Sequence, residues 1–307
     1  MNEASNNPAF YVGRFAPSPT GPLHFGSLVA ALASYLDARH YHGKWLVRIE
    51  DLDPPREQVG AIDDILRCLE AHHLHWDGEI LYQSHRLEAY VEIFEQLKNR
   101  QLIYPCTCTR KALAEIGGLY PGTCRTKTFV DIEQPVAWRL LTDYVVTKSQ
   151  NDDEHYQQFD DLFLGVTTCK NTLGDFIVKR KDGLFAYQLA VVVDDIYQKI
   201  THVIRGNDLL DSTPAQLILF HHLNTPPPQY GHIALALNSQ GQKLSKQHGA
   251  PAVNNADCKN NIIAALKFLN HMPTDELLNA DINAILDWAA NHWHRAKLPK
   301  ENRIVEN

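Results

Sequence analysis

The residues with the clearest chemical potential lie in a proline-rich loop near the N-terminus. The loop reads Arg14-Phe-Ala-Pro-Ser-Pro-Thr-Gly-Pro-Leu-His-Phe-Gly-Ser27. The apolar run at 10–12 before it predicts a strand, and the alanine-rich run at 28–36 after it predicts a buried helix. A stiff loop between a strand and a helix N-terminus presents backbone N–H groups to phosphate in α/β folds. In this loop His24 can donate hydrogen bonds to phosphate oxygens, and Gly26, which has no Cβ, leaves room for a flat purine.

A second candidate loop, Lys243-Leu-Ser-Lys246, follows the last predicted strand at 232–237. Two lysines flanked by Gly241 and Gly249 suit a mobile loop that folds over a triphosphate. Nucleotidyl transfer depends on alignment and charge stabilisation more than on acid–base catalysis, and lysines supply that charge. Taken alone, this segment would be interpreted as an exposed polar loop. The common glycine-rich phosphate fingerprints are absent from the sequence.

A cysteine cluster begins at Cys106-x-Cys108 and continues with Tyr120-x-x-x-Cys124. Three thiolates and one further ligand make the tetrahedral site of a structural zinc ion, and cysteines one residue apart rarely pair with each other in a reducing compartment. His155 is one candidate for the fourth ligand. The alternative is a group of three buried free cysteines. The remaining cysteines are isolated and are expected in the core: Cys68, Cys169 and Cys258.

The elements that must position these loops indicate an α/β fold. Strands are predicted at 44–49 and 201–206, and helices at 57–73, with Val59 on the apolar face, at 86–102 and from Thr213-Pro214 onward. The strand at 44–49 is mostly apolar, which is typical of a parallel sheet covered on both faces. Composition changes at Tyr104. We therefore predict the first half of a nucleotide-binding catalytic domain at 1–103, an inserted zinc-containing subdomain at 104–186, the second half at 187–256 and a helical C-terminal region at 257–307.

Bulk composition bounds the class of protein. The 307 residues are 44% hydrophobic and 21% charged, as in a soluble globular protein. No apolar run approaches the ~18 residues of a membrane span, and the polar N-terminus does not resemble a signal peptide, so we expect a cytoplasmic protein without a membrane partner. The net charge of −7 counts against nucleic-acid binding by electrostatics alone. A local basic face at 179–181 or 294–303 could still bind RNA.

The N-terminal loop resembles the His-Ile-Gly-His element of class I aminoacyl-tRNA synthetases, here His24-Phe-Gly-Ser27, and its first eight residues resemble the glutamyl and glutaminyl branch. Lys243-Leu-Ser-Lys246 is similar to the Lys-Met-Ser-Lys element of the same class. The resemblance implies a Rossmann-type parallel-sheet domain that binds ATP with Mg²⁺. It also implies that His24 and Lys246 stabilise charge on the phosphates. By this resemblance the catalytic residues are His24, Gly26, Lys243 and Lys246, and ATP is bound by His24, Gly26 and Lys246.

The same resemblance implies L-glutamate as the amino acid. Glutamate has two carboxylates, which suit guanidinium groups, and one ammonium, which suits an acidic side chain. Arg14, Glu50 and Arg205 leave different predicted strands and could converge over the sheet. By resemblance, six residues contact glutamate: Arg14, Ala16, Ser18, Glu50, Tyr187 and Arg205. One departure is Val191, which replaces a polar residue that is usual in glutamyl enzymes, so the amino acid or its affinity could differ.

The overall pattern resembles a family of short glutamyl-tRNA synthetase paralogues that modify queuosine. That family uses Cys-x-Cys with Tyr-x-x-x-Cys, which implies one structural Zn²⁺ on Cys106, Cys108, Tyr120 and Cys124. The 61 residues after Lys246 are too few for an anticodon-binding domain. The resemblance implies a monomer that forms glutamyl-adenylate without tRNA. It then transfers glutamate to the cyclopentenediol of queuosine, at the wobble position in the anticodon stem-loop of tRNA(Asp).

Three alternatives stay open at this point. The chain could be a truncated glutamyl-tRNA synthetase that charges a tRNA 3′ end, with its anticodon domain supplied separately. It could be a non-catalytic tRNA-binding paralogue, although a decayed site would have lost some of the residues named above. It could also be a small nucleotidyltransferase of the same superfamily, against which the loop that begins at Arg14 and the cysteine cluster argue.

Overall fold

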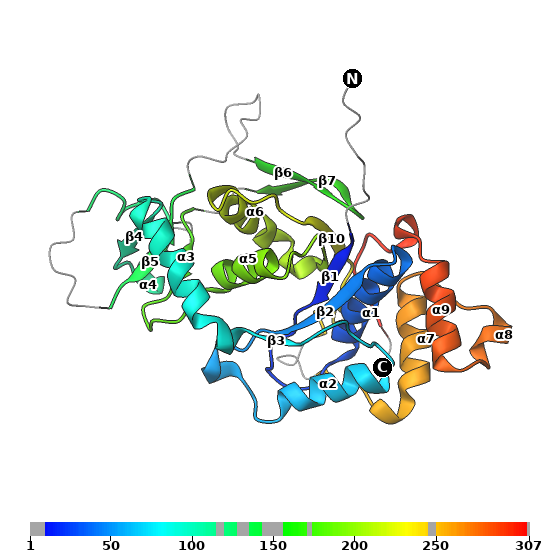
Figure 1. The fold of residues 1–307 in the computed structure, drawn as a ribbon. Coiled ribbons are helices and arrows are strands. Elements are labelled where there is room, and N and C mark those ends of the chain that lie inside the picture. Colours follow the sequence, from blue (N-terminus) through cyan, green and yellow to red (C-terminus); the bar gives the residue numbers. More distant parts are fainter. Residues whose placement is uncertain are drawn as a thin grey trace, which may run out of the picture.

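The core of the fold is a pair of sheets that meet edge to edge (Figure 1). The structure is a computed structural model, and it describes residues 10–114, 120–127, 135–142, 156–170, 174–244 and 250–305. The first sheet holds parallel strands in the order β1-β2-β3: β1 (Val12–Phe15), β2 (Lys44–Ile49) and β3 (Leu81–Tyr82). The second has the order β7-β6-β10-β9: β6 (Tyr156–Asp161), β7 (Gly165–Lys170), β9 (His202–Gly206) and β10 (Gln229–Ile233). Strands β6 and β9 run parallel to β10, and only β7 is antiparallel to its neighbour. The sheets meet where the Thr201 amide, next to β9, donates to the Val12 carbonyl of β1 at 2.9 Å.

Helices cover both faces of the joined sheets, and the alternation of side chains along β2 explains how. Trp45, Val47 and Ile49 are fully buried in the core cluster that α1 also fills, while Arg48 points to the opposite face. That opposite face is covered by α5 and α6, whose apolar residues form a second core with α3. The helices are α1 (Phe25–His40), α2 (Ala61–Ala71), α3 (Leu87–Asn99), α5 (Tyr187–Tyr197) and α6 (Thr213–His222). The prediction of a parallel sheet covered on both faces is confirmed.

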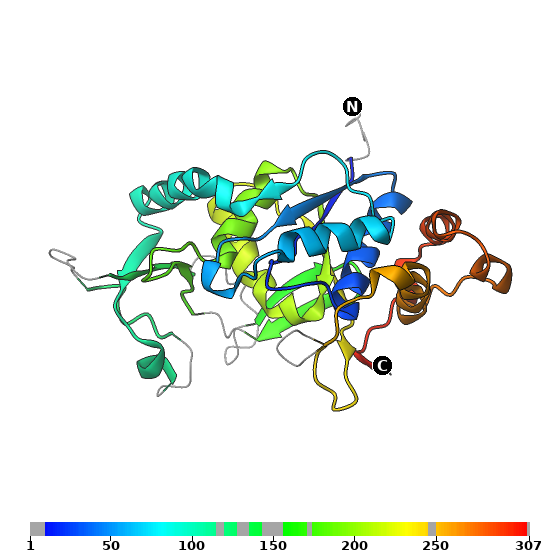
Figure 2. The same ribbon diagram turned by 90° about the horizontal axis from the view of Figure 1, so that it is seen from below.

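Two smaller parts flank this body, one at each end (Figures 1 and 2). At one end, β4 (Ile103–Cys106), β5 (Ala137–Leu140) and β8 (Ile177–Lys179) form an antiparallel sheet beside the short helix α4 (Arg110–Ala114). We call this part the cysteine lobe. At the other end lie α7 (Cys258–Phe268), α8 (Asp275–Leu278) and α9 (Ile282–Asn291), and a short parallel pair joins β11 (Ala236–Leu237) to β12 (Arg303–Ile304). Among the described residues, no helix is both long enough and apolar enough to span a bilayer.

Several predicted boundaries were wrong, each for a local reason. The first strand is β1 at Val12–Phe15 rather than 10–12, so Arg14 lies inside a strand instead of in the loop. The helix predicted at 57–73 begins only at Ala61, because Gly60 precedes it with a left-handed backbone, and Val59 is fully exposed instead of facing the core. The strand predicted at 232–237 is divided between β10 and β11.

Candidate functional site

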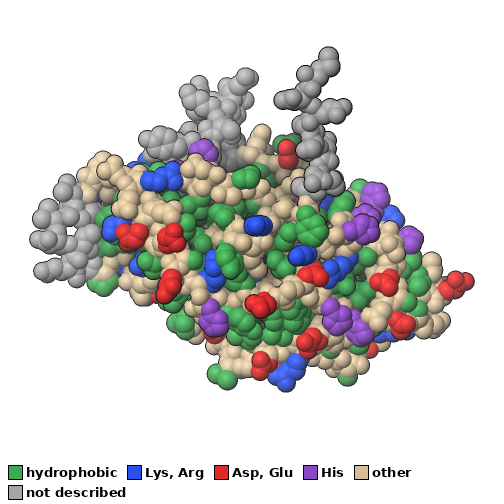
Figure 3. Space-filling model, in the orientation of Figure 1, with side chains coloured by type: hydrophobic (Ala, Val, Ile, Leu, Met, Phe, Trp, Pro, Cys, Tyr) green, Lys and Arg blue, Asp and Glu red, His purple; other side chains and the backbone are tan. Residues whose placement is uncertain are grey.

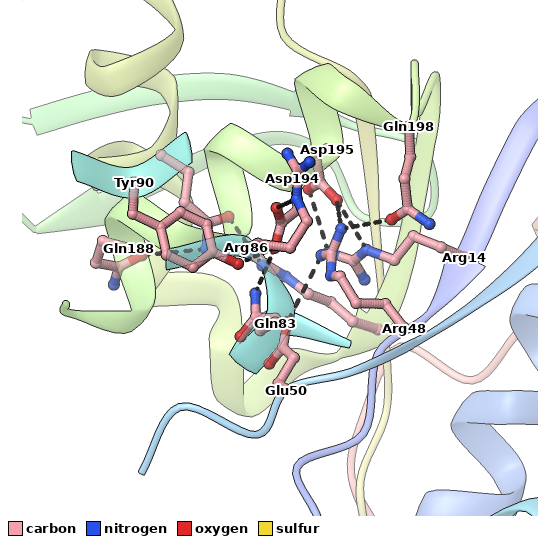
Figure 4. Close-up of polar contacts among 12 residues, drawn as sticks. Arg14, Arg48, Glu50, Gln83, Arg86, Tyr90, Gln188, Asp194, Asp195 and Gln198 are labelled. Carbon is pink, nitrogen blue, oxygen red and sulfur yellow. Dashed lines mark hydrogen bonds and ion pairs between the residues drawn. The ribbon is translucent and has the colours of Figure 1, made fainter. Parts of the chain in front are cut away.

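Two buried arginines share one carboxylate on the face of the sheet that α5 covers (Figure 4). Arg14 of β1 places Nε 3.2 Å from Asp195 Oδ1 and Nη2 3.4 Å from Oδ2, while Arg48 of β2 places Nη1 2.8 Å from Oδ1. Burial alone would raise the pKa of Asp195, but Arg14 and Arg48 outweigh that effect and hold the pKa below its ordinary range. Asp195 therefore stays ionised and fixes both guanidinium groups.

Polar atoms without partners lie beside this ion pair. Glu50 follows β2, and its Oε1 lies 3.5 Å from Arg48 Nη2, outside good hydrogen-bond geometry. Within the described structure, Arg48 Nε and Nη2 and Glu50 Oε1 have no hydrogen-bond partner. Burial raises the pKa of Glu50, although Arg48 and Arg14 oppose the shift. Because buried polar groups are normally paired, these atoms indicate a site that a polar ligand completes.

Arg205 of β9 is a buried cation held only by neutral acceptors. Its Nε donates to His232 Nε2 at 3.0 Å, and Nη1 donates to Gln216 Oε1 at 2.9 Å. Its Nη2 donates to Thr213 Oγ1 at 2.9 Å and to the Leu209 carbonyl at 3.2 Å. Among the described residues, no carboxylate forms an ion pair with Arg205. An uncompensated buried charge is costly, so a carboxylate ligand is the natural partner.

Asp161 of β6 fixes the neutral imidazole of His232, on β10, in one tautomer. Its Nδ1 lies 2.6 Å from Asp161 Oδ2 and donates to it, which leaves Nε2 free of a proton to accept from Arg205. Burial lowers the pKa of His232 even though the bond to Asp161 opposes the shift. The imidazole is therefore neutral near pH 7 and holds the Arg205 guanidinium in place.

The predicted glutamate residues fall into two groups. The first group consists of residues whose charges act on one another: Arg14, Glu50, Arg205 and Tyr187. Burial raises the pKa of Tyr187 and Glu50 adds to that shift, while Arg205 and Arg14 oppose it. Tyr187 is the first residue of α5, and 36% of its surface is exposed. Ala16 is half-buried and Ser18 exposed in the proline-rich loop. That loop is tied to the end of β2 because the Glu50 amide donates to the Pro17 carbonyl at 3.0 Å.

Sequence reasoning missed several residues of this cluster. Arg48 could have been noticed as a charge inside an otherwise apolar strand, and Asp195 as the acid that ends the apolar run of α5. The residues that hold Arg205 had no such signal, because their contacts depend on how the turn after β9, α6 and β10 pack around the guanidinium. Val191, which suggested a changed amino-acid pocket, is fully buried in the apolar core that includes α5 and α6.

The His24 loop has the geometry expected of a helix N-terminus. His24 is the N-cap of α1, with Nδ1 accepting from the Ser27 amide at 3.2 Å and Nε2 lying 3.1 Å from Ser27 Oγ. A Cβ on Gly26 would lie only 3.3 Å from two atoms of the His24 ring. Glycine therefore lets the imidazole rest against the first turn of α1.

The second predicted loop is described only in part. Lys243 forms an ion pair with Asp208, and both side chains are partly exposed. Lys246 and Gly249 lie outside the described residues. On the near side of that segment the Leu244 amide donates to the Ala236 carbonyl, and on the far side the Val253 amide donates to the Leu23 carbonyl, each at 2.9 Å. The far end also reaches His24 through a bridge to Ala252.

The cysteine cluster in the cysteine lobe has the dimensions of a metal site. The sulfur atoms of Cys106, Cys108 and Cys124 all lie within 4.8 Å of one another, and Cys108 and Cys124 are 3.7 Å apart. A tetrahedral zinc site with Zn–S bonds of ~2.3 Å has sulfur–sulfur edges of about 3.8 Å. The Tyr120 hydroxyl accepts from the Cys124 amide at 2.8 Å and interacts with the Cys124 and Cys106 thiols. His155, the less favoured fourth ligand, lies outside the described residues.

A buried carboxylate organises the surroundings of this cluster. Asp175 accepts from Arg125 Nε at 2.6 Å and Nη2 at 2.7 Å, and also from Tyr104 and Thr142. Arg139 donates from Nη1 to the Asp175 carbonyl at 2.6 Å and from Nε to Cys106 Sγ at 3.2 Å. Arg139 therefore links Asp175 to the Cys106 sulfur and fixes one side of the cluster.

Comparison with known proteins agrees with this geometry. Residues 11–273 match the family model of tRNA synthetases class I (E and Q), catalytic domain. A glutamyl-Q tRNA(Asp) synthetase of Colwellia psychrerythraea is 50% identical, with 96% of this chain and 94% of that protein covered. One from Thiobacillus denitrificans is 49% identical, covering 95% and 96% respectively.

Solved structures show the same fold. A glutamate-tRNA synthetase from Elizabethkingia anophelis superposes with a TM-score of 0.78 at 25% identity, covering 97% of this chain and 68% of that chain. A glutamate tRNA ligase from Elizabethkingia meningosepticum, solved in complex with its amino acid, gives 0.76 at 25% identity, covering 96% and 66%. The chain therefore belongs to the class I glutamyl and glutaminyl tRNA synthetase family of ligases, in its glutamyl-Q tRNA(Asp) synthetase branch.

Proposed function

We propose that this enzyme activates L-glutamate with ATP and Mg²⁺ and transfers the glutamyl group to queuosine in tRNA(Asp). An oxygen of the α-carboxylate attacks the α-phosphorus of ATP, the bond to the β-phosphate oxygen breaks, and pyrophosphate leaves. A hydroxyl of the queuosine cyclopentenediol then attacks the acyl carbon, loses its proton and releases AMP. The first half-reaction proceeds without tRNA.

The observation that carries the proposal is the buried set of arginines with spare hydrogen-bonding capacity at the ends of adjacent strands. Arg205 has no carboxylate partner among the described residues, and Arg48 has two nitrogen atoms without a partner. Carboxylates of the substrate would satisfy them, while Glu50 would receive the ammonium group. Arg14, Ala16, Ser18 and Tyr187 complete the proposed glutamate site.

The ATP half of the site would use the His24 loop and the second loop. The N-terminus of α1 provides backbone N–H groups and a favourable dipole for phosphate. Ser27 holds His24 beside Gly26, since its amide donates to Nδ1 and its Oγ lies 3.1 Å from Nε2. We assign the His24 imidazole to a phosphate oxygen when ATP binds. We assign Lys243 and Lys246 to the charge that develops on the phosphates, with Lys243 released from Asp208 when the loop folds over ATP.

We also propose one structural zinc ion in the cysteine lobe, held by Cys106, Cys108, Cys124 and Tyr120. The sulfur spacing and the Arg139 donor support this assignment. When bound, the ion would cross-link β4 to the turn that carries Cys124, and it takes no part in the reaction. The ion would therefore stabilise the lobe.

The choice of RNA rests on the names of the relatives, which specify tRNA(Asp). On the face drawn in Figure 3, acidic and basic side chains are interspersed, with no large field of one sign. Recognition would rely on a splayed anticodon-loop base and its diol. Since the net charge of the chain is −7, we expect only a modest dependence of tRNA affinity on salt concentration.

The test is transfer of labelled glutamate to three RNAs: tRNA(Asp) with queuosine, tRNA(Asp) without it, and queuosine-containing tRNA(Asp) from which the 3′ adenosine has been removed. We expect label on the first and third only. Label that requires the 3′ adenosine and ignores queuosine would instead identify a truncated charging enzyme. Absence of glutamate-dependent pyrophosphate exchange would identify a non-catalytic paralogue.

A further inference from the structure

Tyr230 lies in the middle of the second sheet with its ring in an apolar cluster. It sits on β10, opposite Val203 of β9, and packs with Ile200 and Val203, while partly buried Val12 and Leu46 of the first sheet contact the same cluster. Strand alternation puts Tyr230 on the same face as His232, two residues along β10. The two rings are nearly parallel, 6.2 Å apart. Tyr230 is therefore held rigidly on the face that carries the arginines.

Its hydroxyl group is buried and unsatisfied. Tyr230 is only 2% exposed, and its hydroxyl has no hydrogen-bond partner among the described residues. A buried tyrosine hydroxyl normally finds a partner, because leaving it unpaired costs free energy. The carboxylate of Asp195 is not its partner in this structure, and the hydrogen bonds that Asp195 accepts come from Arg14 and Arg48.

The groups around the hydroxyl are those of the proposed glutamate site. The Arg205 guanidinium lies 5.0 Å from the centre of the Tyr230 ring. Burial raises the pKa of Tyr230, Arg205 and Arg14 oppose that shift, and Asp195 and Tyr187 add to it. The phenol therefore stays protonated near neutral pH and acts as a donor. The hydroxyl group therefore lies near the guanidinium groups of Arg205 and Arg14 and has no acceptor for its proton among the described residues.

We propose that the Tyr230 hydroxyl donates a hydrogen bond to the side-chain carboxylate of the bound amino acid, and so is a specificity-determining residue of the site. This inference rests on the proposed function. The α-carboxylate must reach the α-phosphate beside the His24 loop, so the side-chain carboxylate occupies the buried end between Arg205 and Tyr230. The amide of glutamine would present N–H groups to a set of donors there, which disfavours it.

The test compares Tyr230→Phe with Tyr11→Phe in glutamate-dependent pyrophosphate exchange without tRNA. Tyr11 is a matched control because its buried hydroxyl also faces a carboxylate, Asp37 at 2.6 Å, but in a different part of the protein. We expect Tyr230→Phe to raise the KM for glutamate at least about 10-fold, the effect of a lost hydrogen bond to a charged group, with the KM for ATP unchanged. Tyr11→Phe should lower the thermal midpoint and leave both KM values unchanged.

Thermal unfolding separates a ligand role from a structural one. Without glutamate, Tyr230→Phe should unfold no earlier than wild type, because the hydroxyl has no partner to lose, and added glutamate should raise its midpoint less than that of wild type. An unchanged KM for glutamate, as expected if the hydroxyl held only a water molecule, would overturn the inference, and so would an early midpoint like that of Tyr11→Phe. If the wild-type enzyme showed no glutamate-dependent pyrophosphate exchange, the proposed function itself would be overturned, and the inference with it.

Discussion

Replacing Asp195 by Asn tests whether the buried ion pair organises the site. The substitution keeps the shape of the side chain and removes its charge. In the wild type, the carboxylate is 2% exposed and accepts three hydrogen bonds from two guanidinium groups that are themselves almost completely buried. In the variant, an amide oxygen in the place of Oδ1 can still accept two of these bonds, but it carries no charge, and the amide N–H groups in the place of Oδ2 face Arg14 Nη2.

The expected cost follows from burial. Removing one partner of a buried ion pair leaves an uncompensated charge, which typically costs about 3–5 kcal/mol. Folded proteins of ordinary size are stable by only about 5–15 kcal/mol, so Asp195→Asn should lose a large share of the free energy of unfolding. Because the folded pKa of Asp195 is depressed, its contribution is complete above the unfolded value of about 3.9 and is lost only as pH falls through the folded pKa. The deficit of the variant should therefore be constant between about pH 5 and pH 8.

The assay is urea unfolding of both proteins without ligand, with the free energy extrapolated to water. Asp182→Asn is the matched control, since Asp182 pairs with Arg180 while its side chain is 48% exposed. That exposed pair should contribute less than about 1 kcal/mol. If Asp195→Asn lost no more stability than Asp182→Asn, the argument that desolvated charge organises this face would be refuted.

Three further predictions concern other parts of the molecule. Gly26→Ala should push the His24 ring aside and slow pyrophosphate exchange at least about 10-fold, with the KM for glutamate unchanged; exchange at the wild-type rate would show that the ring position is unimportant. Cys108→Ser should reduce bound zinc, measured by elemental analysis, and lower the thermal midpoint; full metal content would contradict the metal assignment. Because burial depresses the pKa of His232, its support of Arg205 is complete above about pH 6.5 and is lost as pH falls through the folded pKa, so the KM for glutamate should rise in acid. A KM that stays constant down to the lowest pH at which the enzyme remains folded would exclude this coupling.

Short sequence patterns correctly predicted individual elements of the fold, such as one buried strand and the start of one helix. The strand at Lys44–Ile49 was predicted at its observed bounds, because an apolar run bounded by polar residues requires no information from elsewhere. The prediction of a helix opened by Thr213-Pro214 is confirmed for the same reason. The three cysteines with the expected spacing come together as a possible metal site. Their roles as ligands, like those of His24 and Lys243, stay predictions.

Properties that depend on pairing between distant segments were less accessible. A shift of the first strand by a few residues moved Arg14 from the loop into β1, where its contact with Asp195 is fixed by the side-chain alternation of the strand. The residues that hold Arg205 come from α6, β10 and the turn between β9 and α6. Tyr230 looks like an ordinary core aromatic in the sequence, and only its missing partner in three dimensions distinguishes it.

The balance of charge on this face bears on substrate choice. Three buried guanidinium groups, Arg14, Arg48 and Arg205, have only two carboxylates within ion-pair distance in the described structure, Asp195 and Glu50. A third buried carboxylate, Asp161, reaches Arg205 only through the neutral imidazole of His232, so the Arg205 guanidinium itself has no carboxylate in contact. The side-chain carboxylate of L-glutamate would give Arg205 a direct ionic partner. Glutamine has nearly the same shape but no charge on its side chain, so it would leave Arg205 without that partner, and the pocket would disfavour it on electrostatic grounds.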